Sequence, residues 1–571
     1  MADEGEVGAI FSEALLWCLR CARLARDDRG AVAVLFALSV APMTFLVGAA
    51  LDYSGASSLK AQLQKATDGA NLRLCQVAGA PTRDDLVAAA NKLLPTYLGS
   101  APYTIQTLTL SSSPRVIELK TRSLFPTSIL KVFGPAFAQL PVDATATCYG
   151  EPQTFEIALA LDNTGSMALS GGTQSKMEAL KAAATSFVDA IYNNTTLSTA
   201  TTISIVPFAA AVAVNPSSYR GASWIDQAGN ASYHWNIVQG GATAARAHWA
   251  ANRLAAFDRL KTLRSGWDWA GCLESLTYPL NVRDGAPTPS NPDSYFVPML
   301  GPDETGDGGQ VYHTDASGSW VTSPNSYLDD SGGNNCSSTS DENVRFGRVC
   351  KYADPRGAST STGPNAMGPN QSCTSRPLTR LTANKATLLA EIAAMQPAGN
   401  TNIHEGFMWG WRTISPVSVF AADAAAYNKL NNNKIIILMT DGDNTWSVNS
   451  PSSAAKSGHS AYGYFRNPDG SGPNSRLPPA HADPTTDLKA RAAMDALTLE
   501  ACANASASPN NVVIYTIGFS ATADPIDQQS LNMLRTCAGA ADRAYVATDS
   551  NALQVVFQKI ADNISSLRLS R

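Results

Sequence analysis

Residues 154–166 read Thr-Phe-Glu-Ile-Ala-Leu-Ala-Leu-Asp-Asn-Thr-Gly-Ser, and this stretch decides the fold. The apolar run at 155–161 predicts a buried β-strand. It ends in the carboxylate of Asp162, and the hydroxyl side chains of Thr164 and Ser166 follow in the next turn. Because ligands of open α/β sheets bind beyond the carboxyl ends of the strands, the stretch predicts both a central strand and a polar site at its end.

Strands and helices alternate through most of the chain that follows, which is typical of a doubly wound, mainly parallel α/β sheet. Strands are expected at 202–206, 434–439, 511–517 and 544–547, and helices at 176–192, 383–395, after Thr401, at 488–503, 528–534 and 552–566. The fold class is therefore α/β, with helices on both faces of the sheet.

A long segment at about 281–376 interrupts this alternation and is rich in Gly, Ser, Pro, Asn and Asp. Such a segment inside a domain is uncommon unless it is functional or tied down. Three cysteines lie in it and a fourth lies just before it, so we predict a disulfide-rich surface insertion. The acidic residues Asp303, Glu304 and Asp307 lack the spacing of an EF-hand, and no calcium site is assigned to them.

Two further segments carry oxygen ligands. The strand at 434–439 ends in Thr440-Asp441-Gly442-Asp443, which puts a second carboxylate at the end of a neighbouring strand. The segment Gly399-Asn-Thr-Asn402 joins two helices and offers the hydroxyl of Thr401. Carboxylates and hydroxyls suit a hard cation such as Mg²⁺, with Mn²⁺ and Ca²⁺ as alternatives.

These three segments, in this order, resemble the von Willebrand factor type A domain, which has a Rossmann-like fold and a metal-ion-dependent adhesion site. The pattern of that site is Asp-x-Ser-x-Ser, then a Thr, then an Asp. The resemblance implies a metal site formed by Asp162, Thr164, Ser166, Thr401 and Asp441. Thr164 stands where the family usually has Ser, which keeps the hydroxyl. The resemblance also implies that an acidic side chain of a protein partner completes the metal's shell.

Residues 31–51 carry no charged side chain, and as a helix they would be about 31 Å long, enough to cross a bilayer. Four arginines lie at positions 20–29 and Asp52 follows the run, so the positive-inside rule predicts a cytoplasmic N-terminus and an external remainder. A cleaved signal peptide is the alternative. The run is long for such a peptide and no good cleavage site follows, which favours a single-pass anchor.

The ends of this apolar run and two later segments resemble TadG-like pilus-assembly proteins, which combine a TadE/TadG-type membrane segment with a periplasmic type A domain. The similar stretches are Arg29-Gly-Ala-Val-Ala-Val34, Leu51-Asp-Tyr53, Asn400-Thr-Asn-Ile403 and Trp409-Gly-Trp-Arg412. The resemblance implies a bacterial inner-membrane protein with a periplasmic or extracellular bulk and partners among pilus or secretion-system components. Prepilin-peptidase substrates usually have Glu five residues after the cleavage-site Gly, whereas Leu35 follows Gly30 at that spacing, which favours an unprocessed anchor.

Four parts are expected along the chain. They are a cytoplasmic tail at 1–29, a transmembrane and extended helix at 30–75, a small α+β domain at 76–150, and the type A domain with its insertion at 151–571. Eight cysteines follow the membrane segment, and this even number predicts disulfides outside the cytoplasm. Eight cysteines allow 105 pairings, and from the way the cysteines bracket the segments we predict the pairs Cys75 with Cys148 and Cys502 with Cys537.

Several function classes are excluded by what the sequence lacks. A net charge of -5 without a basic run argues against nucleic acid as a partner. There is no Gly-Lys dipeptide for a phosphate-binding loop, no G-x-S-x-G elbow, and Met408 stands where a zinc-protease helix starting at His404 needs its second His. We therefore predict a metal-dependent binding, adhesion or scaffold protein and no enzyme. The alternatives are a structural minor pilus or envelope component without metal-dependent binding, and an unrecognised hydrolase.

Overall fold

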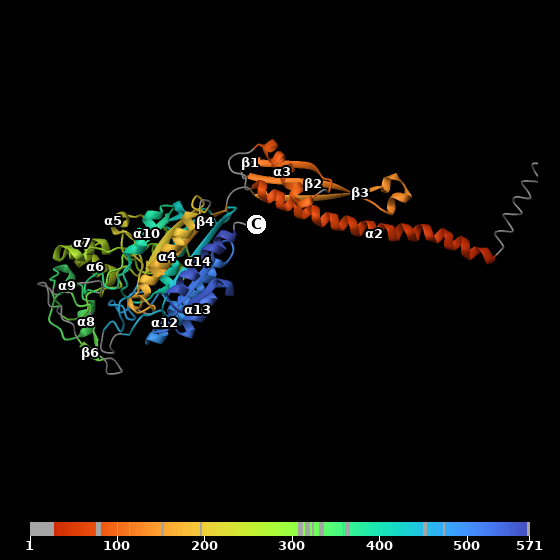
Figure 1. Cartoon of the computed structure of the whole chain (residues 1–571). Coiled ribbons are helices and arrows are strands. Elements are labelled where there is room, and N and C mark those ends of the chain that lie inside the picture. Colours follow the sequence, from red (N-terminus) through yellow and green to blue (C-terminus); the bar gives the residue numbers. More distant parts are fainter. Residues whose placement is uncertain are drawn as a thin grey trace, which may run out of the picture. The chain divides into compact units, whose positions relative to one another are not determined.

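A computed structural model describes residues 28–567 apart from short internal segments, and it divides them into two compact units at residues 151 and 152 (Figure 1). Outside the described residues lie 1–27, 76–81, 100, 113–114, 150–152, 195–196, 307–311, 315–319, 323–324, 331–335, 358, 360–365, 449–453, 472–473 and 568–571. Nearly all of the predicted cytoplasmic tail is among them.

The first unit combines two helices with a three-stranded antiparallel sheet. Helix α2 spans Asp28–Cys75 and α3 spans Arg83–Leu98. The strands β1 (Thr104–Ser112), β2 (Arg115–Pro126) and β3 (Gln139–Tyr149) lie in sequence order in the sheet. Small side chains of α2 and leucines of α3 pack against one face of the sheet; this core comprises Ala66, Ala70, Leu74, Leu86, Ala90, Leu94, Leu108, Ile117 and Leu119.

The apolar run at 31–51 forms the first part of α2. Over the described residues, the structure contains no helix that is both long enough and apolar enough to cross a membrane.

The second unit is built on a six-stranded sheet with the order β11-β10-β9-β4-β5-β8. The strands are β4 (Thr154–Asp162), β5 (Thr201–Phe208), β8 (Thr379–Thr382), β9 (Asn432–Thr440), β10 (Val513–Phe519) and β11 (Ala544–Ala547). The pairings of β4 with β5, β4 with β9, β9 with β10 and β10 with β11 are parallel, and only the edge strand β8 is antiparallel. The predicted mainly parallel α/β sheet is confirmed.

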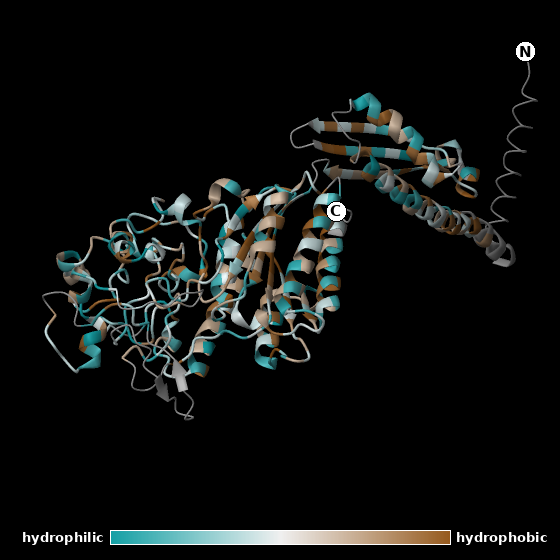
Figure 2. Ribbon diagram, turned by 60° about the vertical axis from the view of Figure 1, so that its left-hand side comes forward, coloured by the Kyte–Doolittle hydropathy of each residue, from teal (hydrophilic) through white to brown (hydrophobic). Residues whose placement is uncertain are grey.

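Alternate residues of β4 supply two separate cores, because successive side chains of a strand point to opposite faces. Phe155, Ile157, Leu159 and Leu161 pack in one core with α4 (Lys176–Asn193), α10 (Lys385–Ala394) and α14 (Ser550–Leu567). Ala158 and Ala160 pack in the other with α11 (Ile403–Ile414), α12 (Asp487–Ser506) and α13 (Gln528–Ala538). Figure 2 shows the hydrophobic strands, in brown, lying between helices.

The insertion begins earlier than the composition indicated, directly after β5. In the described residues between β5 and β8 the chain forms short elements, among them α5 (Pro216–Tyr219), α6 (Gly241–His248), α7 (Arg253–Leu263), α8 (Glu342–Gly347), α9 (Cys350–Ala353) and the small β6–β7 pair (Tyr312–Thr314, Trp320–Thr322). Buried aromatic side chains such as Trp235, Trp249 and Trp267 join it to the core beside α11. Burial of these rings explains how so irregular a segment is ordered.

The acidic residues of the insertion serve its packing. Asp303 is fully buried in an ion pair with Lys351 at 2.8 Å and accepts hydrogen bonds from the backbone N–H groups of Tyr327 and Leu328. Glu304 accepts a hydrogen bond from the hydroxyl of Tyr464 at 2.8 Å. Asp307 lies outside the described residues.

Four disulfides connect the eight cysteines. Cys75–Cys148 and Cys502–Cys537 form as predicted. The other two, Cys272–Cys373 and Cys336–Cys350, lie in the insertion and were left open by the sequence.

Candidate metal centre

Asp162 is the last residue of β4 and its side chain is completely buried. Its Oδ1 accepts hydrogen bonds from the backbone N–H of Thr164 at 2.9 Å and from the Thr164 hydroxyl at 2.5 Å. Its Oδ2 accepts a hydrogen bond from the hydroxyl of Thr440 at 2.6 Å. Leu161 pairs with Met439 in the sheet, and this register brings Thr440 beside Asp162.

A chain of short polar contacts leads from Asp162 to the second carboxylate. Thr164 Oγ1 lies 3.0 Å from Ser166 Oγ, and Ser166 Oγ donates a hydrogen bond to Asp441 Oδ1 at 2.8 Å. Asp441 follows the last residue of β9 and is also buried. The structure therefore brings together four of the five predicted residues: Asp162, Thr164, Ser166 and Asp441.

Thr401 is buried in the loop that precedes α11, and backbone contacts tie this loop to both carboxylate-bearing turns. The N–H of Gly165 donates to the carbonyl of Gly399 at 2.9 Å, and the N–H of Thr445 donates to the carbonyl of Thr401 at 2.9 Å. Gly399 has a φ of +85°, and a Cβ at this position would lie 2.4 Å from the Thr374 hydroxyl, so the loop requires glycine here. Thr401 thus joins the cluster through its backbone.

A buried lysine contacts the second carboxylate. Lys176, at the start of α4, donates from Nζ to Asp441 Oδ2 at 2.8 Å and to Asp524 Oδ2 at 2.7 Å. The side chains of Lys176 and Asp441 are both fully buried, while that of Asp524 is partly exposed. One end of the site therefore already has an internal positive charge.

Burial dominates the electrostatics of the two acids. It raises the pKa of Asp162 to about 7, helped by the negative charge of Asp441 and opposed by the hydrogen bonds from Thr164 and Thr440. Burial also raises the pKa of Asp441, against the attraction of Lys176. Burial makes it unfavourable for both carboxylates to be ionised together. The positive charge of a bound cation would offset this cost.

The donor set fits a hard divalent cation. It consists of two carboxylates and several hydroxyls, and such oxygen ligands are those that Mg²⁺ prefers. Within the described ranges, no three His, Cys, Asp or Glu side chains converge as a metal-binding group. The fit of a cation at this site thus depends on the hydroxyls of Thr164 and Ser166 as well as on the two acids.

Three residues of the cluster were not predicted from the sequence: Lys176, Thr440 and Asp524. Thr440 had a usable signal, because it ends β9 at the position next to Asp162 in the sheet. Lys176 and Asp524 are 348 positions apart in sequence and meet only through the fold.

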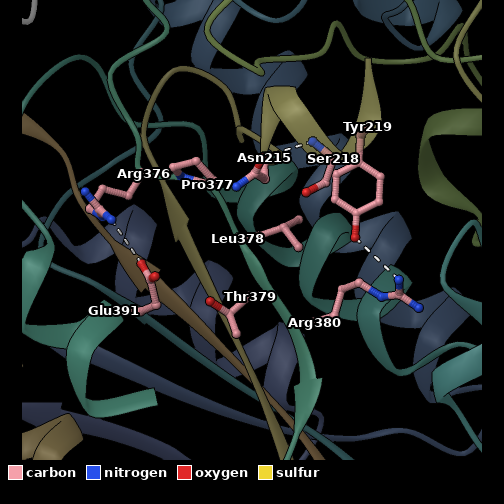
Figure 3. A pocket seen from close by; sticks show the side chains of 9 residues that line it. All are labelled: Asn215, Ser218, Tyr219, Arg376, Pro377, Leu378, Thr379, Arg380 and Glu391. Atoms are coloured by element: carbon pink, nitrogen blue, oxygen red, sulfur yellow. Dashed lines mark hydrogen bonds and ion pairs between the residues drawn. The ribbon is translucent and has the colours of Figure 1, made fainter. Parts of the chain in front are cut away.

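A separate pocket of about 270 Å³ lies beside the edge strand β8 (Figure 3). Its two arginines already have partners, since Arg376 pairs with Glu391 at 3.3 Å and Arg380 donates to the hydroxyl of Tyr219 at 3.5 Å. None of the five predicted metal ligands lines this pocket.

Two family models match the chain. Residues 30–72 match the model described as putative Flp pilus-assembly TadE/G-like, and residues 370–559 match that of the von Willebrand factor type A domain. The chain therefore has the two parts of a TadG-like protein. The type A match begins in the last part of the insertion and includes Thr401 and Asp441. β4 with Asp162 precedes the insertion and pairs with β9 in the same sheet.

No curated protein matches the chain in sequence. Among solved structures, the PilB minor pilin from Streptococcus sanguinis aligns at 11% identity with a TM-score of 0.31, covering 81% of this chain and 78% of that one. The vWF domain of the type V pili tip protein Mfa5 from Porphyromonas gingivalis aligns at 12% identity with a TM-score of 0.30, covering 74% and 97%. Similarities of this size carry no functional argument.

Proposed function

We propose that this TadG-like chain is a membrane-anchored, extracytoplasmic binding or scaffold protein of a Flp/Tad-type pilus, and that it acts without catalysis. The two family matches support a pilus-related role in the cell envelope. The observation that carries the proposal is the cluster of Asp162, Thr164, Ser166 and Asp441 at the ends of two neighbouring parallel strands, in which only Ser166 is half-buried and the others are buried. This cluster is proposed to hold Mg²⁺, or Mn²⁺ or Ca²⁺, and to use it to bind a protein partner.

In this proposal each type of ligand has a different role. Asp162 and Asp441 supply negative charge, and Thr164, Ser166 and Thr401 offer uncharged hydroxyl oxygens, directly or through water. A cation with few charged ligands stays a strong Lewis acid and attracts an acidic side chain of the partner. The hydrogen bonds between Asp162 and Thr164 hold the ligand turn in place before any ion arrives.

The anchor belongs to the same proposal. Residues 31–51 lack charged side chains, and α2 leaves large apolar side chains exposed along the described part of this run. They are Phe36, Leu38, Val40, Met43, Leu46, Val47 and Leu51. Such a surface is stable only when lipid or protein covers it, and the length of the run suits a bilayer in the bacterial inner membrane.

Calorimetric titration of the chain with Mg²⁺, Mn²⁺ and Ca²⁺ at pH 8 tests the metal site. Saturable binding is expected for the parent chain and its loss for Asp441→Ala. Asp562→Asn, on the exposed side of α14, is the matched control and should bind like the parent. Equal titrations for Asp441→Ala and the parent would remove the metal site and leave a structural envelope component.

Metal affinity should depend on pH. Because the pKa of Asp162 is raised to about 7, protons compete with the metal for its carboxylate below that pH. We expect affinity to be nearly constant above pH 8 and to fall by about tenfold per pH unit between pH 6 and 5, where one proton must be displaced. Calorimetry at several pH values measures this, and a flat profile down to pH 5 would contradict it.

Replacing Lys176 with methionine should make stability more dependent on metal. Without the ammonium group, the buried Asp441 loses its partner, which should cost about 3 kcal/mol in the metal-free protein. A bound cation would then be the main compensating charge, so Mg²⁺ should raise the melting temperature of Lys176→Met more than that of the parent. Thermal unfolding with and without Mg²⁺ checks this, with Lys181→Met on the same helix as the control. Equal Mg²⁺ shifts in Lys176→Met and the parent would argue against the metal lying near Asp441.

A further inference from the structure

The connection between β2 and β3 forms a compact apolar turn, which we call the hairpin tip (residues 127–138). It contains two short 3-10 helices, η1 (Leu130–Phe133) and η2 (Pro135–Phe137). In Figure 1 the tip forms the small orange turns beside α2, past the label of β3. Its sequence, Thr-Ser-Ile-Leu-Lys-Val-Phe-Gly-Pro-Ala-Phe-Ala, has one charged residue, Lys131.

Asp52 of α2 fixes the position of the tip. Its carboxylate accepts hydrogen bonds from three consecutive backbone N–H groups, those of Ser128, Ile129 and Leu130, at 2.9, 3.0 and 2.9 Å. Asp52 is also the first charged residue after the apolar run at 31–51. The start of η1 is therefore held at the end of that run.

Close packing extends these contacts back into the apolar run. A Cβ at Gly48 would lie 2.5 Å from a methyl group of Ile129, so the glycine lets the tip approach the helix closely. The rings of Phe45 and Phe137 meet edge to face with their centroids 5.8 Å apart. The tip thus lies alongside residues 45–52, which correspond to about 10 Å of helix.

The outer surface of the tip is apolar and uncovered. Val132 is 77% exposed and Phe137 is 40% exposed, although both belong to residue types that are usually buried. Lys131 is exposed beside them. Valine and phenylalanine beside a lysine suit the boundary of a bilayer, where rings enter the acyl region and an ammonium group reaches lipid phosphate.

We propose that the hairpin tip is a second membrane contact, which inserts Val132 and Phe137 into the outer interface of the bilayer that α2 crosses. This inference rests on the proposed anchor. If residues 31–51 span the hydrocarbon core, the contacts to Phe45, Gly48 and Asp52 place the tip at its outer boundary. The tip then fixes the depth and rotation of α2 at the point where the chain leaves the membrane.

A fluorescent label tests the contact in the full chain. Val132→Cys is made with Cys18→Ser and Cys21→Ser, because the remaining eight cysteines form disulfides. An environment-sensitive dye is attached, and the protein is reconstituted into phosphatidylcholine vesicles containing some phosphatidylglycerol and lipids with a nitroxide on the acyl chain. Blue-shifted emission and several-fold quenching by the nitroxide lipids are expected.

Tyr97→Cys is the matched control in the same unit. Tyr97 is 49% exposed and packs beside Gly69, which lies about 26 Å farther along α2 than Asp52. A label there should emit as in water and escape quenching. Asp52→Ala, combined with the label at position 132, should reduce the quenching, because the tip loses its three hydrogen bonds to α2.

Vesicle flotation separates this inference from the anchor. A chain that floats with the vesicles while its label at position 132 stays in water would overturn the inference and leave the anchor standing. A chain that does not float would overturn both. A label that is shielded from water, unquenched by lipid and self-quenched at high protein density would indicate a second copy on the tip, which also overturns the proposal.

Discussion

Asp162→Asn should abolish metal binding and, at the same time, stabilise the metal-free type A domain at pH 8. The carboxyl of Asp162 has a pKa raised from 3.8 to about 7 by burial, so it binds its proton more tightly in the folded than in the unfolded chain. Stability is therefore lost as the pH rises from about 4 through 7, and the loss is complete at pH 8. Asparagine has no proton to lose and avoids this cost.

The surrounding hydrogen bonds accommodate asparagine. Its side-chain oxygen can accept the two bonds from Thr164, and its amide can donate to the Thr440 hydroxyl, which then acts as acceptor. A gain on the order of 3 kcal/mol is expected at pH 8, and it should vanish at pH 4. Urea unfolding in EDTA, followed by tryptophan fluorescence, measures the gain. Calorimetry measures the lost binding. Destabilisation at pH 8 would show that Asp162 is ionised and well compensated without metal.

The second large effect is expected at Glu274, a fully buried acid of the insertion. It pairs with Arg253 on one oxygen and with Arg476 on the other, and both guanidinium groups are buried. Arg253 comes from α7, whereas Arg476 comes from the long loop after β9. Glu274→Gln keeps the shape of the side chain but leaves two buried positive charges without their counter-charge. A loss of about 3–5 kcal/mol is expected.

Glu391→Gln is the matched control for this substitution. Glu391 also pairs with an arginine, Arg376 at 3.3 Å, but both side chains are partly exposed. Its replacement should change stability by less than about 1 kcal/mol. Tryptophan fluorescence reports on unfolding of the second unit, because nine of the ten tryptophans lie beyond residue 152. Similar losses in both variants would show that the buried network contributes no more than a surface pair.

The sequence predicted best those elements whose residue pattern is set by burial against helices or by a local hydrogen-bonded cap. The apolar runs at 157–161 in β4 and 435–439 in β9 are uninterrupted because both faces of these strands are covered by helices, and their ends place Asp162 and Asp441 together. Helix α4 was recognisable from its period and begins with a capping box formed by Ser175 and Glu178.

The remaining features depend on contacts that are remote in sequence. The edge strand β8 has only four residues, Thr-Arg-Leu-Thr, none of them fully buried, so it has no hydrophobic signature. The insertion is ordered by buried aromatic rings and by ion pairs such as that of Asp303 with Lys351, and not by regular elements. The contact of Lys176 with Asp441 likewise follows from the sheet's topology, so the internal charge of the site was not predicted.

The Cys272–Cys373 disulfide closes a ring of the chain, and its two cysteines are 101 positions apart. A peptide bond cut inside this ring would leave the two ends of the chain covalently joined, and the sheet strands on either side would stay on one molecule. The strands of the type A domain would therefore stay covalently connected even if one peptide bond of this long irregular segment were cut. A proteolytic cut in that ring can therefore be tolerated more readily than a cut in the strands it connects.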